Sequence, residues 1–92
     1  MSKAALKYTI DHTPSARRDL KELKKNHLVL ESVVESIKGL ADNPRPAGAE
    51  ALEGDVTYRI RDGEYRIIYE IDDKSRTVTV TRVRDRKDVY KH

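Results

Sequence analysis

Residues 58–71 constrain the fold more than any other part of the chain, because apolar and polar side chains alternate on both sides of an Asp62-Gly63 pair. This pattern is typical of a two-residue β-hairpin, in which the central turn residues adopt positive φ. With Asp62 and Gly63 as those central residues, the predicted register places Arg61 opposite Glu64, Ile60 opposite Tyr65, Arg59 opposite Arg66 and Tyr58 opposite Ile67.

The alternation sorts the hairpin into two faces, because successive side chains of a strand point to opposite sides. One face is apolar and carries Tyr58, Ile60, Tyr65, Ile67, Tyr69 and Ile71. The other face carries Arg59, Arg61 and Arg66. Like charges directly opposite each other are destabilising. The sequence therefore indicates that the arginine face binds an anion.

The rest of the chain predicts an α+β domain. Alternation predicts a strand over residues 5–11, and Thr13-Pro14 is a typical helix start, with Thr as N-cap and Pro at the first helical position. A second helix is expected from residue 27 to Ala41, closed by Asn43-Pro44. A final strand is expected over residues 77–83, with a bulge or strand end near Arg82.

The order β-α-α-β-β-β then predicts two antiparallel helices packed on one face of an antiparallel sheet, with the arginine face open to solvent. The length of 92 residues indicates a single domain spanning residues 1–92. Alternation does not assign Arg84 or Arg86 to a face, because the period breaks after Val80.

Composition argues against several kinds of site. The chain has no cysteine, and His12, His27 and His92 do not show metal-ligand spacing. Scattered serines and glycines match neither a nucleophile elbow nor a phosphate loop, so no metal or cofactor is expected. Absence of cysteine, of a membrane-length apolar run and of a signal-peptide core is compatible with a cytoplasmic protein. A net charge of +3 permits nucleic-acid binding without requiring it.

Arginine and tyrosine remain as the side chains that can carry chemistry. The planar guanidinium matches phosphate geometry. A tyrosine surrounded by arginines has its pKa lowered from about 10, and it can then accept the proton of an RNA 2′-hydroxyl. Arg59, Arg61 and Arg66 share a face, and Arg86 and Tyr90 follow the last strand. The alternative is a solvated sheet face with Tyr90 packing the C-terminus.

The chain resembles the RelE/ParE superfamily of toxins from bacterial and archaeal toxin–antitoxin pairs over nearly its whole length. The resemblance rests on Tyr8-Thr9-Ile10, on residues 16–23 (ARRDLKEL) and 40–44 (LADNP), on Leu52-Glu53-Gly54, on the hairpin, and on residues 83–90 (VRDRKDVY). It implies helices packed against a twisted antiparallel sheet. RelE-type members are ribosome-dependent endoribonucleases that cut mRNA in the decoding site without a metal, whereas ParE-type members inhibit DNA gyrase.

By this resemblance, five residues match the catalytic positions of the RelE type: Arg59, Arg61, Arg66, Arg86 and Tyr90. Tyr90 would be the general base and Arg86 the acid or charge stabiliser, while the others hold the scissile phosphate. Retention of all five favours the ribonuclease over the gyrase inhibitor. A weakly active protein that mainly binds its antitoxin is a third alternative. The implied partners are a RelB-like antitoxin, the ribosome and mRNA, with a toxin–antitoxin hetero-oligomer expected.

Overall fold

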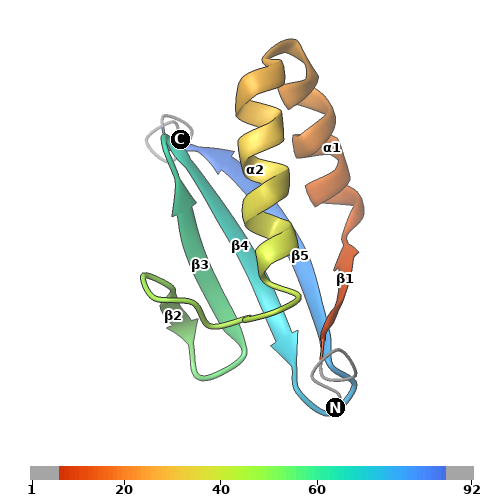
Figure 1. Ribbon diagram of the computed structural model, residues 1–92, viewed down its shortest axis with the longest axis vertical. Helices are drawn as coiled ribbons and strands as arrows, with labels where there is room; N and C mark the ends of the chain where they lie inside the picture. Colours follow the sequence, from red (N-terminus) through yellow and green to blue (C-terminus); the bar gives the residue numbers. More distant parts are fainter. Residues whose placement is uncertain (1–6, 87–92) are drawn as a thin grey trace.

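A computed structural model describes residues 7–86 and shows two helices packed on one face of a five-stranded sheet (Figure 1). The elements are β1 (Thr9–His12), α1 (Pro14–Glu22), the 3₁₀ turn η2 (Leu23–Lys25), α2 (His27–Gly39), β2 (Glu50–Glu53), β3 (Thr57–Asp62), β4 (Tyr65–Asp72) and β5 (Thr77–Asp85). The strand order is β1-β5-β4-β3-β2. The predicted α+β class is confirmed, and the sheet is mixed because β1 runs parallel to β5.

The two helices begin where the sequence predicts. The Thr13 hydroxyl accepts a hydrogen bond from the Ala16 backbone N–H at 3.1 Å, and Pro14 occupies the first turn of α1. The Asn26 side chain caps α2 in the same way by accepting from the Val29 N–H at 3.4 Å. Each cap satisfies a backbone donor that the helix itself leaves without a partner.

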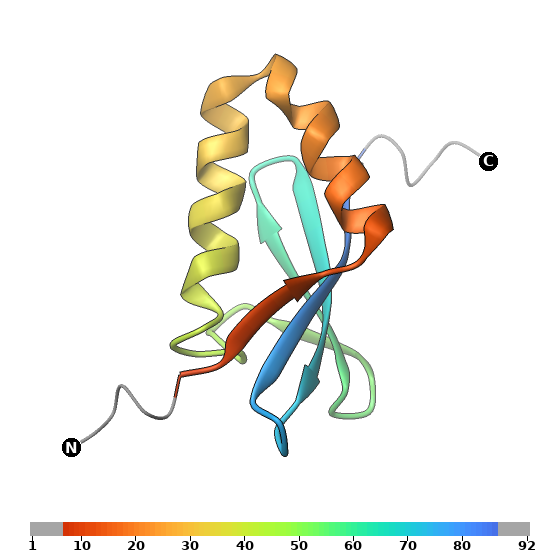
Figure 2. The same cartoon turned by 90° about the vertical axis from the view of Figure 1, so that its right-hand side faces the viewer.

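Figure 2 shows the helices and the sheet from the side, and the core lies between the helices and the apolar face of the sheet. Its fully buried large side chains are Tyr69, Leu40, Ile67, Val33, Val78 and Val80. The predicted apolar face of the hairpin therefore packs against the helices, and the arginine face lies on the opposite side of the sheet.

The predicted hairpin register is wrong by two positions. Arg61 lies opposite Arg66, and Arg59 lies opposite Ile68 instead of Arg66. The two central turn residues are Gly63 and Glu64, and Gly63 alone of the pair has positive φ (61°). A turn with glycine at the first central position is the type II′ turn, which leaves Asp62 in the strand. Because the shift is an even number, the assignment of side chains to faces is unchanged.

Asp62 gains two partners from this position. Its carboxylate accepts hydrogen bonds from the Ser32 and Ser36 hydroxyls of α2, each at 2.9 Å. These bonds fasten the hairpin tip to the helix layer.

The predicted break near Arg82 is a β-bulge. Ile68 of β4 lies opposite Arg82, and the next residue, Tyr69, lies opposite Val80, so Thr81 is an extra residue in β5. The bulge changes the alternation, which places Val83 in the core together with Val80. Arg84 consequently lies on the open face of the sheet.

Strand β2 is absent from the sequence prediction. All four of its residues, Glu-Ala-Leu-Glu, are exposed, and they lack the alternation that identifies a half-buried strand. The strand forms as an edge partner of β3, with Glu50 opposite Arg59.

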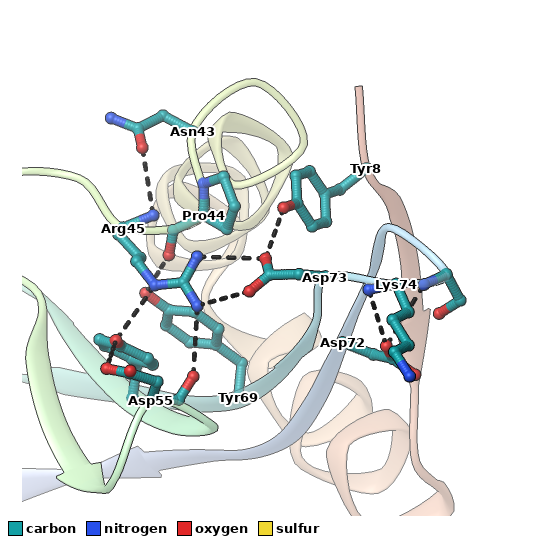
Figure 3. A network of polar contacts seen from close by, with 11 residues as sticks. Tyr8, Asn43, Pro44, Arg45, Asp55, Tyr69, Asp72, Asp73 and Lys74 are labelled. Carbon is teal, nitrogen blue, oxygen red and sulfur yellow. Dashed lines mark hydrogen bonds and ion pairs between the residues drawn. The ribbon is translucent and has the colours of Figure 1, made fainter. Parts of the chain in front are cut away.

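A polar network closes the end of the sheet away from the hairpin tip (Figure 3). The Arg45 guanidinium donates to both carboxylate oxygens of Asp73, at 3.2 and 3.0 Å, and its Nε donates to the Tyr58 hydroxyl at 3.1 Å. The Tyr8 hydroxyl donates to Asp73 at 2.6 Å. Arg45 therefore joins the loop before β2 to β3 and to the β4–β5 turn.

Tyr69 lies beneath this network. Its buried hydroxyl donates to the Pro44 carbonyl at 2.7 Å, and burial raises its pKa to about 12. Tyr69 is therefore held in its neutral form.

Candidate functional site

Three arginines form a row across three neighbouring strands. Arg66 of β4 lies directly opposite Arg61 of β3 on one side and directly opposite Arg84 of β5 on the other. Adjacent strands are about 4.8 Å apart, so these side chains emerge within reach of one another. We call these three residues the arginine row. It lies on the face of the sheet that the helices do not cover.

The arginine row has no direct ion pair in the part of the chain that the structure describes. Within residues 7–86, none of the three side chains makes an ion pair or a hydrogen bond to another side chain. Arg61 is exposed, whereas Arg66 and Arg84 are half-buried. Like charges at this spacing oppose folding, and an anion that binds all three relieves the repulsion.

Arg86 joins the row at the hairpin tip. Its backbone N–H donates to the Glu64 carbonyl at 2.7 Å, and its guanidinium Nη1 lies 3.7 Å from a Glu64 carboxylate oxygen. A polar hollow of ≈330 Å³ results, lined by Arg61, Gly63, Glu64, Arg66 and Arg86. The hollow is large enough for a phosphate group and presents guanidinium groups from two strands and the β5 terminus.

Arg59 lies on the same face but is already paired. It forms an ion pair with Glu50 of β2, and only 24% of its side chain is exposed. The hydrogen bond from Arg59 lowers the pKa of the Glu50 carboxyl, and the charges of Arg59, Arg61 and Arg66 lower it further. The Arg59 Nε is buried without a hydrogen-bond partner among the described residues. The Glu50 carboxylate is therefore stabilised by the positive charges of several arginines on this face.

The structure brings together three of the five residues that the sequence nominated: Arg61, Arg66 and Arg86. Arg59 shares their face but is held by Glu50. Tyr90 lies outside the described residues. Sequence reasoning missed Arg84, because only the bulge at Thr81 assigns it to this face.

The described residues contain no group of three metal-ligating side chains close enough together to hold an ion. They also contain no helix of the length and apolar character that crossing a membrane requires.

Known proteins share both the sequence and the architecture of this chain. Residues 10–90 match the family model for the ParE toxin of the type II toxin–antitoxin system parDE. Toxin RelG of Mycobacterium tuberculosis is 40% identical over 88 residues, which cover 91% of this chain and 97% of the relative.

Two solved structures illustrate the shared fold. The RelBE2 toxin–antitoxin complex of Mycobacterium tuberculosis superposes with a TM-score of 0.73 at 35% identity, over 86% of this chain and 98% of the other. The isolated RelE toxin of E. coli gives a TM-score of 0.74 at 21% identity, over 85% of this chain and 83% of the other. The chain therefore belongs to the RelE/ParE superfamily of toxins from type II toxin–antitoxin systems.

Proposed function

We propose that this toxin is a ribosome-dependent endoribonuclease that cuts messenger RNA in the decoding site. The observation that supports the proposal is the arginine row, in which three arginines lie opposite one another on neighbouring strands and none of them forms a direct ion pair among residues 7–86. Arginine binds phosphate oxygens through two parallel N–H donors, and a fixed cluster stabilises the charge that develops on a phosphate under attack.

The proposed reaction is internal transesterification. Tyr90 accepts the proton of an RNA 2′-hydroxyl, and the 2′-oxygen forms a bond to the adjacent phosphorus. The bond from phosphorus to the 5′-oxygen of the next nucleotide then breaks, and Arg86 serves that oxygen as acid or charge stabiliser. Arg59, Arg61, Arg66 and Arg84 hold the phosphate oxygens. No metal takes part in this scheme, because the base and the charge stabilisers are all side chains.

The shape of the site supports the requirement for the ribosome. The hollow is small and open, and two of its neighbouring arginines already face the carboxylates of Glu50 and Glu64. Such a surface does not by itself order a flexible RNA strand, and ordering is a major part of the cost of binding. A message held in the decoding site is already ordered. The proposal therefore places the toxin in the cytoplasm.

We also propose that a RelB-like antitoxin binds this toxin in a hetero-oligomer. The Mycobacterium tuberculosis structure described above is a complex of this kind, and it superposes over 86% of this chain. An antitoxin segment with acidic side chains would neutralise the arginine row and thereby block access of RNA.

Inhibition of DNA gyrase is the second candidate function. It is favoured by the match of residues 10–90 to the family model of the parDE toxin. A gyrase inhibitor does not cleave RNA, so it does not need the arginine row to stabilise a phosphate under attack. The two functions therefore differ in whether the arginine row takes part in a chemical reaction.

Induced expression followed by primer extension on a translated message tests the proposal. We expect cuts within codons, and these cuts should disappear when translation is blocked. The double variant Tyr90→Phe with Arg86→Ala should also abolish the cuts. Lys74→Gln, in the distant β4–β5 turn, is the control and should cut normally. Growth arrest with intact message and inhibited supercoiling would instead establish the gyrase function. Overexpression of folded protein without growth arrest would favour a protein that mainly binds antitoxin.

A further inference from the structure

The outer surface of α1 and η2 carries a continuous group of positively charged side chains. At 100° per residue, Arg17, Arg18 and Lys21 lie on one continuous arc of the helix, opposite the core-facing residues. Lys24 and Lys25 of η2 continue the arc toward the end of the sheet that holds the hairpin tip. We call these five residues the basic arc.

The positive charge of the basic arc is mostly uncompensated among the described residues. All five side chains are exposed, and only Lys25 has an ion pair within residues 7–86, with Glu22 at 3.1 Å. Asp19, the other acidic residue of α1, is engaged elsewhere. Its carboxylate accepts from the Arg82 Nε at 2.9 Å and from the Val83 backbone N–H at 2.8 Å.

The composition of the arc indicates the chemistry of its partner. The buried centre of a protein–protein interface is apolar and depleted in lysine. The basic arc contains no apolar side chain, and the exposed large hydrophobic residues of the described chain, Leu28, Leu52 and Val56, are not part of it. Binding of a phosphate backbone, in contrast, depends strongly on lysine and arginine and needs no apolar side chain. Residues 17–25 extend about 12 Å at 1.5 Å per residue, a length that can contact more than one phosphate of a duplex strand.

The arc is fixed relative to the arginine row. Asp19 fastens α1 to β5 just before Arg84, and a hollow lined by residues of both layers, among them Lys25, Tyr65 and Asp85, joins η2 to the hairpin end of the sheet. Figure 1 shows the α1–α2 connection and the β3–β4 hairpin tip at the same end of the molecule. The end of the basic arc at the α1–α2 connection and the arginine row thus lie at one end of the protein.

We propose that the basic arc is a second RNA-binding surface, which contacts the phosphate backbone of double-stranded RNA next to the single strand at the arginine row. Two linked contacts to one RNA raise the overall affinity, because the second contact forms within a complex that the first already holds. This inference goes beyond the proposed function, since binding of a duplex requires no cleavage.

The test compares two double variants that remove the same charge. Lys21→Gln with Lys24→Gln neutralises the arc, and Lys38→Gln with Lys74→Gln removes two exposed lysines elsewhere; each lowers the net charge from +3 to +1. Fluorescence anisotropy with a labelled RNA duplex of about 20 base pairs is measured over a salt series. For the arc variant we expect roughly tenfold weaker binding near 0.1 M salt and a log–log salt slope shallower by between about 1 and 2. The control variant should retain nearly all of the wild-type slope.

Equal weakening by both variants would overturn the proposal, because net charge alone would then explain binding. Unchanged duplex binding by the arc variant would also overturn it, and loss of a co-purifying antitoxin in that variant would then assign the arc to an acidic protein. Thermal unfolding confirms that both variants fold. If the wild-type protein cuts no message while the arc variant still loses duplex binding, the proposed nuclease function fails and the second RNA surface stands.

Discussion

The two ends of the sheet use arginine in opposite ways. At the end shown in Figure 3, Arg45 donates two hydrogen bonds to Asp73, one to the Tyr58 hydroxyl and one to the Asp55 carbonyl. At the hairpin end, Arg61, Arg66 and Arg84 lie opposite one another, and within residues 7–86 none of them has a counter-ion. The Arg45 guanidinium is thus satisfied within the fold, whereas the arginine row has no direct ion pair among the residues that the structure describes.

In a chain with 19 lysines and arginines, this difference distinguishes arginines that are bonded within the fold from arginines that remain available to a ligand. A satisfied guanidinium such as that of Arg45 stabilises the fold through its hydrogen bonds. A row of like charges opposes folding, and under the proposed function a phosphate of the RNA supplies the compensation. The following predictions test whether the two ends separate in this way, beginning with the largest effect.

Arg66→Ala should nearly abolish message cleavage without unfolding the protein. Arg66 is the centre of the arginine row and contacts the hollow, so its loss removes the donor between Arg61 and Arg84. Loss of one such charge stabiliser typically lowers a rate by about 100-fold to 1000-fold. Relief of repulsion and loss of packing by the arginine stem oppose each other, so stability should change by less than about 1 kcal/mol. Primer extension and thermal unfolding of the same preparation measure both effects.

Lys38→Ala, on the exposed side of α2, provides the control for loss of one positive charge and should cleave like the wild type. The separation of the two ends is contradicted if Arg66→Ala cleaves normally, or if it loses activity only because it unfolds.

Arg45→Ala should show the reverse behaviour, with lowered stability and retained chemistry in the fraction that remains folded. It removes the bidentate pair with Asp73 and the bond to the Tyr58 hydroxyl. Because more than a third of the Arg45 side chain is exposed, we expect a loss of only about 1 kcal/mol, which lowers Tm by roughly 4–8 °C. Calorimetry measures the change, and Lys74→Ala in the neighbouring turn should leave Tm almost unaltered. If the folded fraction of Arg45→Ala lost as much cleavage activity as Arg66→Ala does, the two ends would not be separate.

The sequence predicted most of the elements because their signals are local. Thr13-Pro14 specifies a helix start through its own cap geometry, and period-two alternation assigns the faces of the hairpin without tertiary information. Family resemblance supplied the positions of Arg61, Arg66 and Arg86, which the structure brings into one hollow.

The remaining features depend on contacts that no local pattern records. Asp62-Gly63 suits two turn types, and the serines of α2 that bind the Asp62 carboxylate are distant in sequence. The parallel pairing of β1 with β5 and the pairing of exposed β2 with β3 are tertiary choices. Arg84 reaches the open face only because one extra residue, Thr81, interrupts the alternation.

The pKa of the Glu50 carboxyl reports the positive charge of the arginine face, although its effect on stability is small. Arg59, and to a lesser degree Arg61 and Arg66, lower the pKa of its carboxyl from the usual 4.5. A carboxyl with a lowered pKa contributes stability at pH values above its unfolded pKa, and that contribution is lost as pH falls through the folded pKa. A carbon-detected NMR titration should therefore place the Glu50 midpoint below 4.5. Arg59→Gln should raise this midpoint most, and Arg66→Gln should raise it less, whereas Arg45→Gln should not move it. If Arg45→Gln raised the midpoint as much as Arg66→Gln, the two ends of the sheet would share one field and the comparison would fail.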